Sequence, residues 1–281
     1  MQDAFAYCAE LVRAADRDRF LSSLFAPAEH RAALHALYAF NVEVARVREV
    51  AREPLPGEIR LQWWSEVLRG ERAEEASANP VASALLTVIE RYRFASTKLA
   101  ALIDARCFDL YDDPMARLTD LEAYANKTSS ALIALAAQIL AGGEGELAET
   151  VANDAGIAYA IAGLIRAFPL HAARRQLYVP LELLERHRVD PQDIFAGKSS
   201  KNLRAVFVEL QDVACRHLLA AHQQIATLPD AALPAFLPVA LVRPSLDRLA
   251  RCDPFAPAEL SPWRRQWLIW RAARNPARIA G

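Results

Sequence analysis

The sequence is poor in cysteine and glycine, and this excludes several kinds of site. Its 281 residues include only four cysteines and nine glycines. The cysteines lie far apart and form no CxxC pair, so neither a zinc ribbon nor a disulfide framework is expected, and a reducing compartment fits best. The glycine-loop patterns GxGxxG and GxxxxGK[ST] are missing, as are GxSxG and HExxH. Nucleotide binding through a glycine loop and zinc proteolysis therefore have no support in the sequence.

Strong net charge and long apolar runs are also absent. The formal net charge is −1 at pH 7, so the chain has no overall attraction to nucleic acid, and we expect no nucleic-acid partner. No uninterrupted apolar run reaches the ~18 residues that suggest a transmembrane helix, and residues 1–20 include early acids and no signal-like apolar run. From this we expect a cytoplasmic protein.

The apolar residues that are present recur at helical spacing. They make up 53% of the chain, and alternating apolar and polar runs are nearly absent, which is typical of an all-α protein. The pattern predicts helices over residues 29–53, 58–69, 80–93, 97–112, 117–141, 146–168, 202–227 and 262–275. Thr119 and Glu122 resemble a capping box in the fifth of these. We treat residues 1–281 as one domain, with the Pro-rich turn at 229–238 as the only candidate border.

One stretch of the chain contains no acid at all. Between Ala155 and Leu181 there is no Asp or Glu, whereas residues 166–180, RAFPLHAARRQLYVP, carry a histidine and three arginines. Hard cations such as magnesium bind to oxygen ligands, mainly carboxylates. The side chains of this stretch are therefore the wrong ones for magnesium.

Acidic residues do gather in the segment FDLYDDP. Asp109 and Asp113 are four residues apart, so on a helix their carboxylates would point the same way, as a magnesium–diphosphate site requires. The same residues could equally be solvated acids at the end of a helix before Pro114, and both interpretations remain open. The six histidines are scattered. His217 and His222 are five residues apart and do not share a helix face, so we expect no metal there.

Several segments, taken together, resemble the squalene/phytoene synthase family. They follow one another in that family's order and spacing: LFAPAEHRAALHALYAFNVEVARVREV, EIRLQWWSEVL, LIDARCFDL, LEAYANKTSSALIAL and AGLIRAFPLHAARRQLYVP. The resemblance covers roughly residues 15–225 and leaves residues 226–281 as additional C-terminal helices. It implies one large all-α bundle of the isoprenoid synthase type with a central cavity. Active members of the family condense two polyprenyl diphosphates head to head.

In that family two DxxxD-type motifs on facing helices hold the magnesium ions that bind the substrate diphosphate. The first motif should follow the YAF segment, and its two aspartate positions fall on Ala45 and Glu49. The second should lie in the acid-free stretch, where its positions fall on Ala167 and His171. Only Glu49 is acidic, so three of the four carboxylates are missing. The resemblance thus implies a degenerate site with no confident catalytic residue and no metal or other cofactor.

Other family positions are retained. Tyr124 matches the tyrosine of a family segment that lines the reaction cavity, although it could be an ordinary core tyrosine. If the pocket still binds a phosphorylated ligand, arginines would hold the anion without metal. The cavity and anion-binding candidates are Arg46, Tyr124, Arg166, His171, Arg174, Arg175 and Tyr178. For Arg174 and Arg175, a solvated loop pair is an equal alternative.

One branch of the family is more similar to this chain than the synthases are. The segments FNVEVARVRE, RLQWW and RAFPLHAARRQLYVP resemble members of this branch, which support assembly of respiratory complex I and also lack the aspartate pairs. The similarity implies a pseudoenzyme with a protein partner, such as a complex I subunit, and a retained cavity for an isoprenoid or lipid. A lipid carrier without chemistry is a hypothesis that the sequence does not separate from this one.

A competing hypothesis is a working enzyme. It would be a prenyl transferase that acts on farnesyl or geranylgeranyl diphosphate and assembles its Mg²⁺ site from other acids. The alternative metal ligands are Glu43, Glu49, Asp109 and Asp113. This hypothesis needs ligands from a second helix, and the acid-free stretch offers none.

The C-terminal segment is basic and rich in tryptophan. Residues 261–281 carry five arginines and no acid. Trp263, Trp267 and Trp270 stand at i, i+4 and i+7, so a helix here would have an aromatic face flanked by positive charge, which suits a membrane interface or an acidic partner. The alternative is a closing helix whose tryptophans pack on the bundle. A peripheral membrane contact of a cytoplasmic protein is therefore one expectation.

Overall fold

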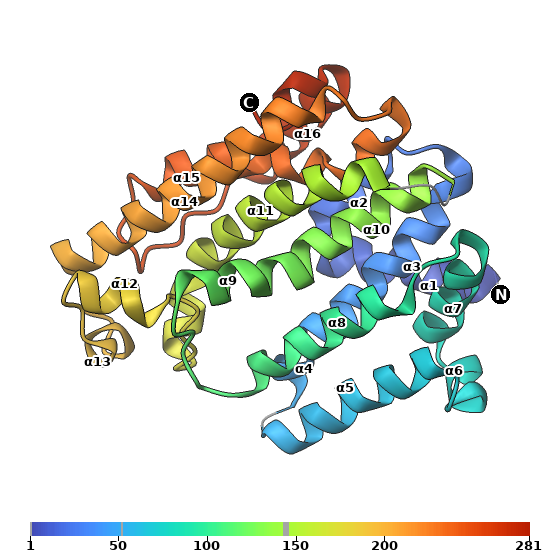
Figure 1. The fold of residues 1–281 in the computed structure, drawn as a ribbon, viewed down its shortest axis with the longest axis horizontal. Helices are drawn as coiled ribbons and strands as arrows, with labels where there is room; N and C mark the ends of the chain where they lie inside the picture. The colour runs from blue at the N-terminus through green and yellow to red at the C-terminus, as the bar shows by residue number, and fades with distance from the viewer. Residues whose placement is uncertain (1, 52, 143–145) are drawn as a thin grey trace.

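Helices form the regular structure of the described residues, which are 2–51, 53–142 and 146–281 of a computed structural model (Figure 1). No β-strand occurs among these residues, so the all-α prediction is confirmed. The α-helices are α1 Gln2–Ala15, α2 Arg17–Ser23, α3 Ala28–Ala45, α4 Val47–Val50, α5 Pro54–Arg69, α6 Ala73–Ala78, α7 Pro80–Tyr92, α8 Ser96–Arg106, α9 Leu118–Ala125, α10 Ala131–Leu140, α11 Glu146–Ala173, α12 Leu181–Arg186, α13 Pro191–Phe195, α14 Lys201–Ile225, α15 Val242–Leu249 and α16 Pro262–Arg274. The 3₁₀ helices are η1 Cys107–Leu110, η3 Asp230–Ala235, η4 Leu237–Leu241 and η5 Pro276–Arg278, and η2 Asn126–Ser130 is a π-helical turn.

The helices α3 and α10 form the centre of the bundle because they are apolar on nearly every side. Residues 33–42 of α3 are all buried, and so are eight of the ten residues of α10. A helix that is hydrophobic all round is expected in a core. The helices α1 and α7 pack against α3, and α11 packs against both α10 and α14. Figure 1 shows α11 and α14 running side by side across the molecule.

The long helix α11 forms one wall of the bundle. By length and composition it could cross a membrane, but more than half of the most apolar part of Ala148–Ala173 is buried within the bundle, as in the core helix of a soluble protein. Gly156 allows α11 to approach the η2 turn closely, because a Cβ atom there would lie 2.3 Å from Ser130 Cα. This close crossing places α11 beside the π-helical turn.

Two predicted helices end earlier than their apolar pattern suggests. The helix predicted over 29–53 ends at Ala45, and the short α4 begins only after Arg46, whose backbone (φ −97°, ψ 6°) is outside the helical region. The helix predicted over 97–112 ends at Arg106 and continues to Leu110 only as the 3₁₀ helix η1. Periodicity alone does not show such breaks, because the apolar spacing continues through them.

The helix predicted over 117–141 is interrupted by the η2 turn. There Thr128 donates its hydroxyl to the carbonyl of Tyr124 at 2.7 Å, a contact that often bends helices. The predicted capping box is wrong, because Asp120 accepts the N–H of Arg117 at 2.9 Å and Thr119 lies inside α9. The helix predicted to end at residue 168 instead runs on to Ala173.

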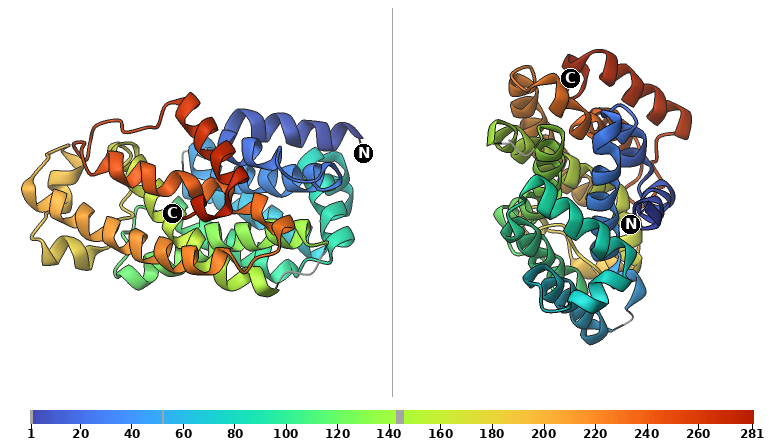
Figure 2. Two further views of the ribbon diagram at one scale, coloured as in Figure 1. Left: turned by 90° about the horizontal axis from the view of Figure 1, so that it is seen from above. Right: turned by 90° about the vertical axis from the view of Figure 1, so that its right-hand side faces the viewer.

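The C-terminal helices cover one side of the bundle. The helix α16 packs on η4 and α2, and α15 packs on α11. The side chain of Ser261 caps α16 by accepting the N–H of Arg264. Figures 1 and 2 show α16 at one edge of the molecule and α5 at the opposite edge.

Candidate functional site

A pocket of about 440 Å³ opens between the start of α2, the C-terminal end of α3, the η2 turn, α11 and α16. Its size is in the range of small-molecule sites. The polar residues that line it are Asp16, Arg17, Asp18, Arg19, Asn41, Arg106, Tyr124, Thr128, Ser129, Tyr159, Arg166 and Arg265. Five arginines face two aspartates, so the pocket favours anions over cations.

Arg19 is a buried cation at the side of this pocket. Its Nη1 donates to Asp16 Oδ2 at 2.5 Å, and its guanidinium lies 5.1 Å from the centre of the Tyr159 ring and 5.8 Å from that of Tyr38. Burial alone would lower the pKa of Arg19, but the Asp16 carboxylate outweighs burial and leaves the pKa above its usual value. Arg19 is therefore charged at all physiological pH values. It supplies a fixed positive charge to the pocket from within the chain.

The C-terminal helix contributes Arg265 to the same pocket. Arg265 Nη2 forms an ion pair with Asp18 Oδ2 on α2, and only 4% of Asp18 is exposed. The other carboxylate oxygen of Asp18, Oδ1, is buried without a hydrogen-bond partner in the chain. This ion pair ties α16 to the pocket, although the two helices are far apart in the sequence.

A second polar cluster is centred on Asp109. This carboxylate accepts the hydroxyl of Tyr178 at 2.7 Å and that of Tyr124 at 2.9 Å, and it forms an ion pair with Arg106 at 3.1 Å. Gln176 donates to the backbone carbonyl of Asp109 at 3.0 Å. Burial raises the pKa of both tyrosines, so they remain neutral hydrogen-bond donors. Asp109 is thus fully engaged by partners within the chain.

Arg106 and Tyr124 connect this cluster to the pocket, which they both line. Arg106 Nη1 lies 2.7 Å from the Tyr124 hydroxyl oxygen. Its Nε is buried without a hydrogen-bond partner in the chain. Burial lowers the pKa of Arg106, but the Tyr124 hydroxyl and the Asp109 carboxylate outweigh this and hold the pKa above its usual value. Arg106 therefore brings a permanent positive charge to the lining of the site.

The positions expected for metal ligands do not form a carboxylate cluster. Ala45 lines the pocket. Glu49 lies on α4, where Arg46 and Arg174 pair with its carboxylate at 3.1 and 3.6 Å. Among residues 2–51, 53–142 and 146–281, no group of three His, Cys, Asp or Glu side chains could hold a metal ion. The donor set at these positions does not fit the magnesium cluster of a prenyl synthase.

His171 and Ala167 occupy the other two positions, on α11. The ring of His171 lies 4.6 Å from that of Tyr178, centre to centre. Burial lowers the pKa of His171 to about 4, so the imidazole is neutral at pH 7. In that form it supplies no charge for a diphosphate anion.

The alternative metal ligands lie in different surroundings. Glu43 pairs with Arg60 at 3.5 Å, and Asp109 is enclosed by its two tyrosines. Asp113 is exposed in the segment that follows η1. Since α8 ends before Asp109, the prediction that Asp109 and Asp113 share a helix face is wrong. We expected no metal at His217. Its ring nitrogens form hydrogen bonds with the carboxylates of Asp154, at 2.7 Å, and Glu122, at 3.3 Å.

The anion-binding candidates divide into two groups. Arg166 lines the pocket together with Tyr124. Arg46 and Arg174 lie around Glu49 instead, outside the pocket lining. Arg175 stacks over Phe195 at 4.7 Å and has a positive φ of 58°, a backbone conformation that often ends a helix.

Beside the arginine pocket, the space between α9, α11 and α14 is almost filled. A cavity of only about 10 Å³ remains there, lined mainly by apolar side chains that include Phe168 and Phe207. These two rings pack edge to face with centres 4.7 Å apart. Such a volume holds about one water molecule, which is far less than a polyprenyl chain needs.

Sequence reasoning missed Arg19, Arg106 and Arg265, the cations that face Asp16, Asp109 and Asp18. Two signals were available. Asp16 precedes Arg19 by three residues, which is the spacing of a helix N-cap and its first turn. Arg106 lies in a family-like segment, LIDARCFDL, but its pairing with Asp109 depends on the turn from α8 into η1.

Comparisons with known proteins find a matching family and several named relatives. The family model for squalene/phytoene synthase matches residues 12–271. The human protein named "NADH dehydrogenase (ubiquinone) complex I, assembly factor 6" is 33% identical over 247 residues, which cover 88% of this chain and 74% of that protein. The rat protein of the same name is 32% identical over 251 residues, covering 89% of this chain and 75% of that protein. A Drosophila melanogaster homologue is 29% identical, covering 88% and 75%.

Two solved structures show the same fold. One is squalene synthase HpnC from Alicyclobacillus acidocaldarius, with a TM-score of 0.76 and 22% identity, covering 89% of this chain and 94% of that one. The other is a dehydrosqualene synthase in complex with ligand, with a TM-score of 0.83 and 15% identity, covering 97% and 96%. At these identities the likeness shows a shared fold only.

Proposed function

The chain belongs to the squalene/phytoene synthase family, and we propose that it works as an assembly factor for a respiratory NADH dehydrogenase and not as a prenyl transferase. Support comes from its relatives, which are named as assembly factors of complex I and align with 88% or more of this chain. In this proposal the bundle acts through protein contacts. Its partner is a subunit or assembly intermediate of the dehydrogenase, and its place of action is the cytoplasm and the membrane surface.

One observation carries the proposal, namely the side chains at the four expected metal-binding positions. They are two alanines, an imidazole held neutral by burial, and a glutamate that two arginines already neutralise. Ionising an allylic diphosphate releases a multiply charged anion, which carboxylate-bound magnesium must stabilise. Without that carboxylate set the chain has no means to drive the ionisation. We therefore expect no prenyl transferase activity and no metal cofactor.

The arginine pocket supports binding of an anion without metal. Arg106 of α8 and Arg166 of α11 both line this pocket. Guanidinium groups bind phosphate through two parallel hydrogen bonds. We propose that the pocket takes the diphosphate or phosphate end of an isoprenoid or lipid as a structural ligand. The adjoining apolar cavity is nearly filled. The hydrocarbon part of a bound ligand would therefore extend out of the pocket through its open side.

The outer face of α16 supports a peripheral contact with an anionic membrane. Trp263, Trp267 and Trp270 are 81, 50 and 47% exposed, so a large part of each side chain is open to a membrane surface. A hollow of about 220 Å³ lies beside the start of α16, and its lining residues include Arg248, Arg251 and Arg264. Tryptophan at the interface and arginine near anionic headgroups both favour such binding.

Genetic complementation tests the proposed function. Deletion of the gene in its own cell should lower the NADH:quinone oxidoreductase activity of isolated membranes, and the wild-type chain should restore it. The variant Glu49→Gln, which removes the last acid at the metal positions, should restore the activity equally well. If Glu49→Gln folds normally but fails to complement, the carboxylate has a chemical role and the proposal is wrong.

A further inference from the structure

Another concave surface lies on the side of the molecule opposite α16. It is a groove of about 700 Å³ between α5, α8 and the start of α6. Its floor contains the buried side chains of Leu61 and Ile103, with Trp63 and Cys107 partly buried beside them. Figures 1 and 2 show that α5 forms the edge of the bundle here, with no helix packed on its outer side.

The edge of this groove exposes large apolar side chains. Leu55 and Ile59 of α5 are 64 and 62% exposed, and Val50 and Tyr111 near the same end are 60 and 42% exposed. Single exposed apolar residues are ordinary, but a group of them beside a groove is typical of an interaction site. Leu55 and Ile59 stand one helical turn apart, so a partner could contact both.

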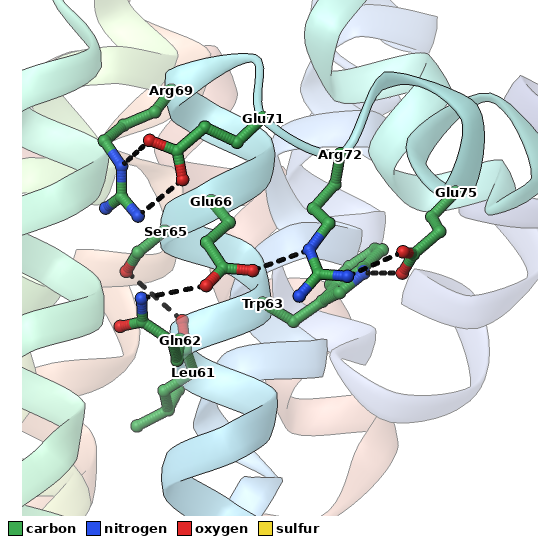
Figure 3. Close-up of polar contacts among 9 residues, drawn as sticks. All are labelled: Leu61, Gln62, Trp63, Ser65, Glu66, Arg69, Glu71, Arg72 and Glu75. Carbon is green, nitrogen blue, oxygen red and sulfur yellow. Dashed lines mark hydrogen bonds and ion pairs between the residues drawn. The ribbon is translucent and has the colours of Figure 1, made fainter.

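The groove is acidic. Glu58, Glu66, Glu75 and Asp104 line it, whereas Arg72 is its only basic lining residue among those described. Arg72 is held between two of the acids, because its Nε donates to Glu66 at 2.7 Å and its Nη1 donates to Glu75 at 2.9 Å (Figure 3). Four negative charges thus face one positive charge, which gives this surface an excess of negative charge.

Local hydrogen bonds hold these acids in place. Glu66 also accepts the amide of Gln62 at 3.1 Å, and Glu75 accepts the indole N–H of Trp63 at 2.8 Å (Figure 3). These hydrogen bonds lower the pKa of both carboxyls. The wall of the groove therefore stays charged at neutral pH, and its shape is fixed before a partner arrives.

We infer that the groove binds a basic amphipathic helix of a protein partner, with the apolar face of that helix on Leu55, Ile59 and Trp63 and its Lys or Arg side chains toward the acids. This inference rests on the proposed function and adds the chemical class of the partner segment. A helix laid into an apolar groove is a common mode of recognition. The 16 residues of α5 span about 24 Å at 1.5 Å per residue, so a partner helix of similar length matches the groove.

The charge of the groove distinguishes this occupant from others. An anionic lipid surface would be repelled by the acidic wall, and the basic, tryptophan-rich face of α16 lies on the other side of the molecule. The two surfaces therefore differ in charge and in partner. A second copy of the chain, which could present its own α16 to the groove, is the remaining alternative, and the experiment separates it.

The experiment uses the full chain and two designed 16-residue peptides with the same leucine face. One has lysine on its polar face and the other has glutamate. The lysine peptide should bind at least ~10-fold more tightly at low salt, since only its charges complement the groove. Equal affinities for the two peptides would overturn the inference.

The native cysteines report where the peptide binds. Cys107 lies in the groove, while Cys215 lies on α14, and burial raises the pKa of both thiols above the ordinary value. The lysine peptide should slow maleimide alkylation of Cys107 several-fold and leave the rate at Cys215 unchanged, as measured by peptide mass spectrometry. Equal protection of both thiols, or protection of neither, would contradict the inference.

Matched substitutions complete the test. Ile59→Ser should weaken binding of the lysine peptide roughly tenfold, because it removes most of one apolar contact. Val208→Ser on α14, which is 56% exposed, is the control and should leave binding unchanged. If instead the wild-type chain dimerises as its concentration rises and Ile59→Ser stays monomeric, the occupant is a second copy of the chain. Since these readouts need no respiratory activity, they can fail while the complementation experiment succeeds.

Discussion

Tyr178 donates its hydroxyl to the Asp109 carboxylate at 2.7 Å, which joins the segment after α11 to the 3₁₀ helix η1. Tyr124 from α9 makes a second hydrogen bond to the same carboxylate, and Arg106 supplies the neutralising charge. A buried carboxylate is tolerated only when it is paired and hydrogen-bonded. This cluster therefore binds three parts of the bundle together behind the arginine pocket.

Substitutions in the Asp109 cluster should affect stability strongly and unequally. Asp109→Ala leaves the buried Arg106 without its counterion and should lower the free energy of unfolding by about 3–5 kcal/mol. Tyr178→Phe removes one hydrogen bond to a charged group and should cost about 1–3 kcal/mol. Urea denaturation of the purified chains measures both. A loss below about 1 kcal/mol for Asp109→Ala would show that the Asp109 carboxylate does not stabilise the buried Arg106 as described above.

His171 should make the stability depend on pH. Its pKa in the folded chain is about 4, below the value of 6.5 for a free imidazole, because burial disfavours the cation. Between these pH values the unfolded chain binds more protons, so the free energy of unfolding falls as pH falls from about 6.5 to 4. The full difference in pKa sets an upper limit, and we expect a contribution of roughly 1–3 kcal/mol.

The variant His171→Phe isolates this contribution, since it keeps an aromatic ring against Tyr178 and removes the titrating group. Between pH 7 and pH 4 the wild type should lose more stability than the variant does. Parallel pH profiles of the two chains would show that His171 does not titrate as described.

Arg166 should strengthen anion binding in the pocket. Isothermal titration with pyrophosphate in the presence of EDTA should detect binding by the wild type. Arg166→Ala should weaken it roughly tenfold or more, which corresponds to the loss of a charge-assisted hydrogen bond. Arg174→Ala is the control, because Arg174 pairs with Glu49 outside the pocket lining. Equal weakening by both substitutions would place the anion elsewhere.

The tryptophans of α16 should anchor the chain to anionic vesicles. In sedimentation with vesicles of phosphatidylcholine and phosphatidylglycerol, the double variant Trp263→Ala, Trp267→Ala should bind at least several-fold more weakly than the wild type. Leu219→Ala on α14, where the leucine is 58% exposed, should not change binding. If the double variant binds as well as the wild type but unfolds more easily, these tryptophans serve packing and not membrane contact.

The residues that could be predicted from the sequence are those whose role depends on local pattern. The all-α fold followed from helical spacing, and Ala45 and His171 could be placed because their segments resemble a family motif. The pocket itself could not be predicted in this way. Arg19, Arg106 and Arg265 come from three separate helices, and only the tertiary packing brings them together.

Breaks inside continuous apolar patterns were the second limit. Asp109 and Asp113 do not share a helix face because α8 gives way to a 3₁₀ helix at Cys107. The spacing of apolar residues does not reveal this change. The same holds for Arg46, whose backbone ends α3 and turns its side chain toward Glu49 instead of the pocket.

The most direct test of the central claim is diphosphate release. The purified chain is incubated with farnesyl or geranylgeranyl diphosphate and Mg²⁺, and inorganic pyrophosphate is measured over time. We predict no release above the rate without protein, for the wild type and for Glu49→Gln alike. Steady turnover by the wild type would contradict the account, and its loss in Glu49→Gln would assign the activity to that carboxylate.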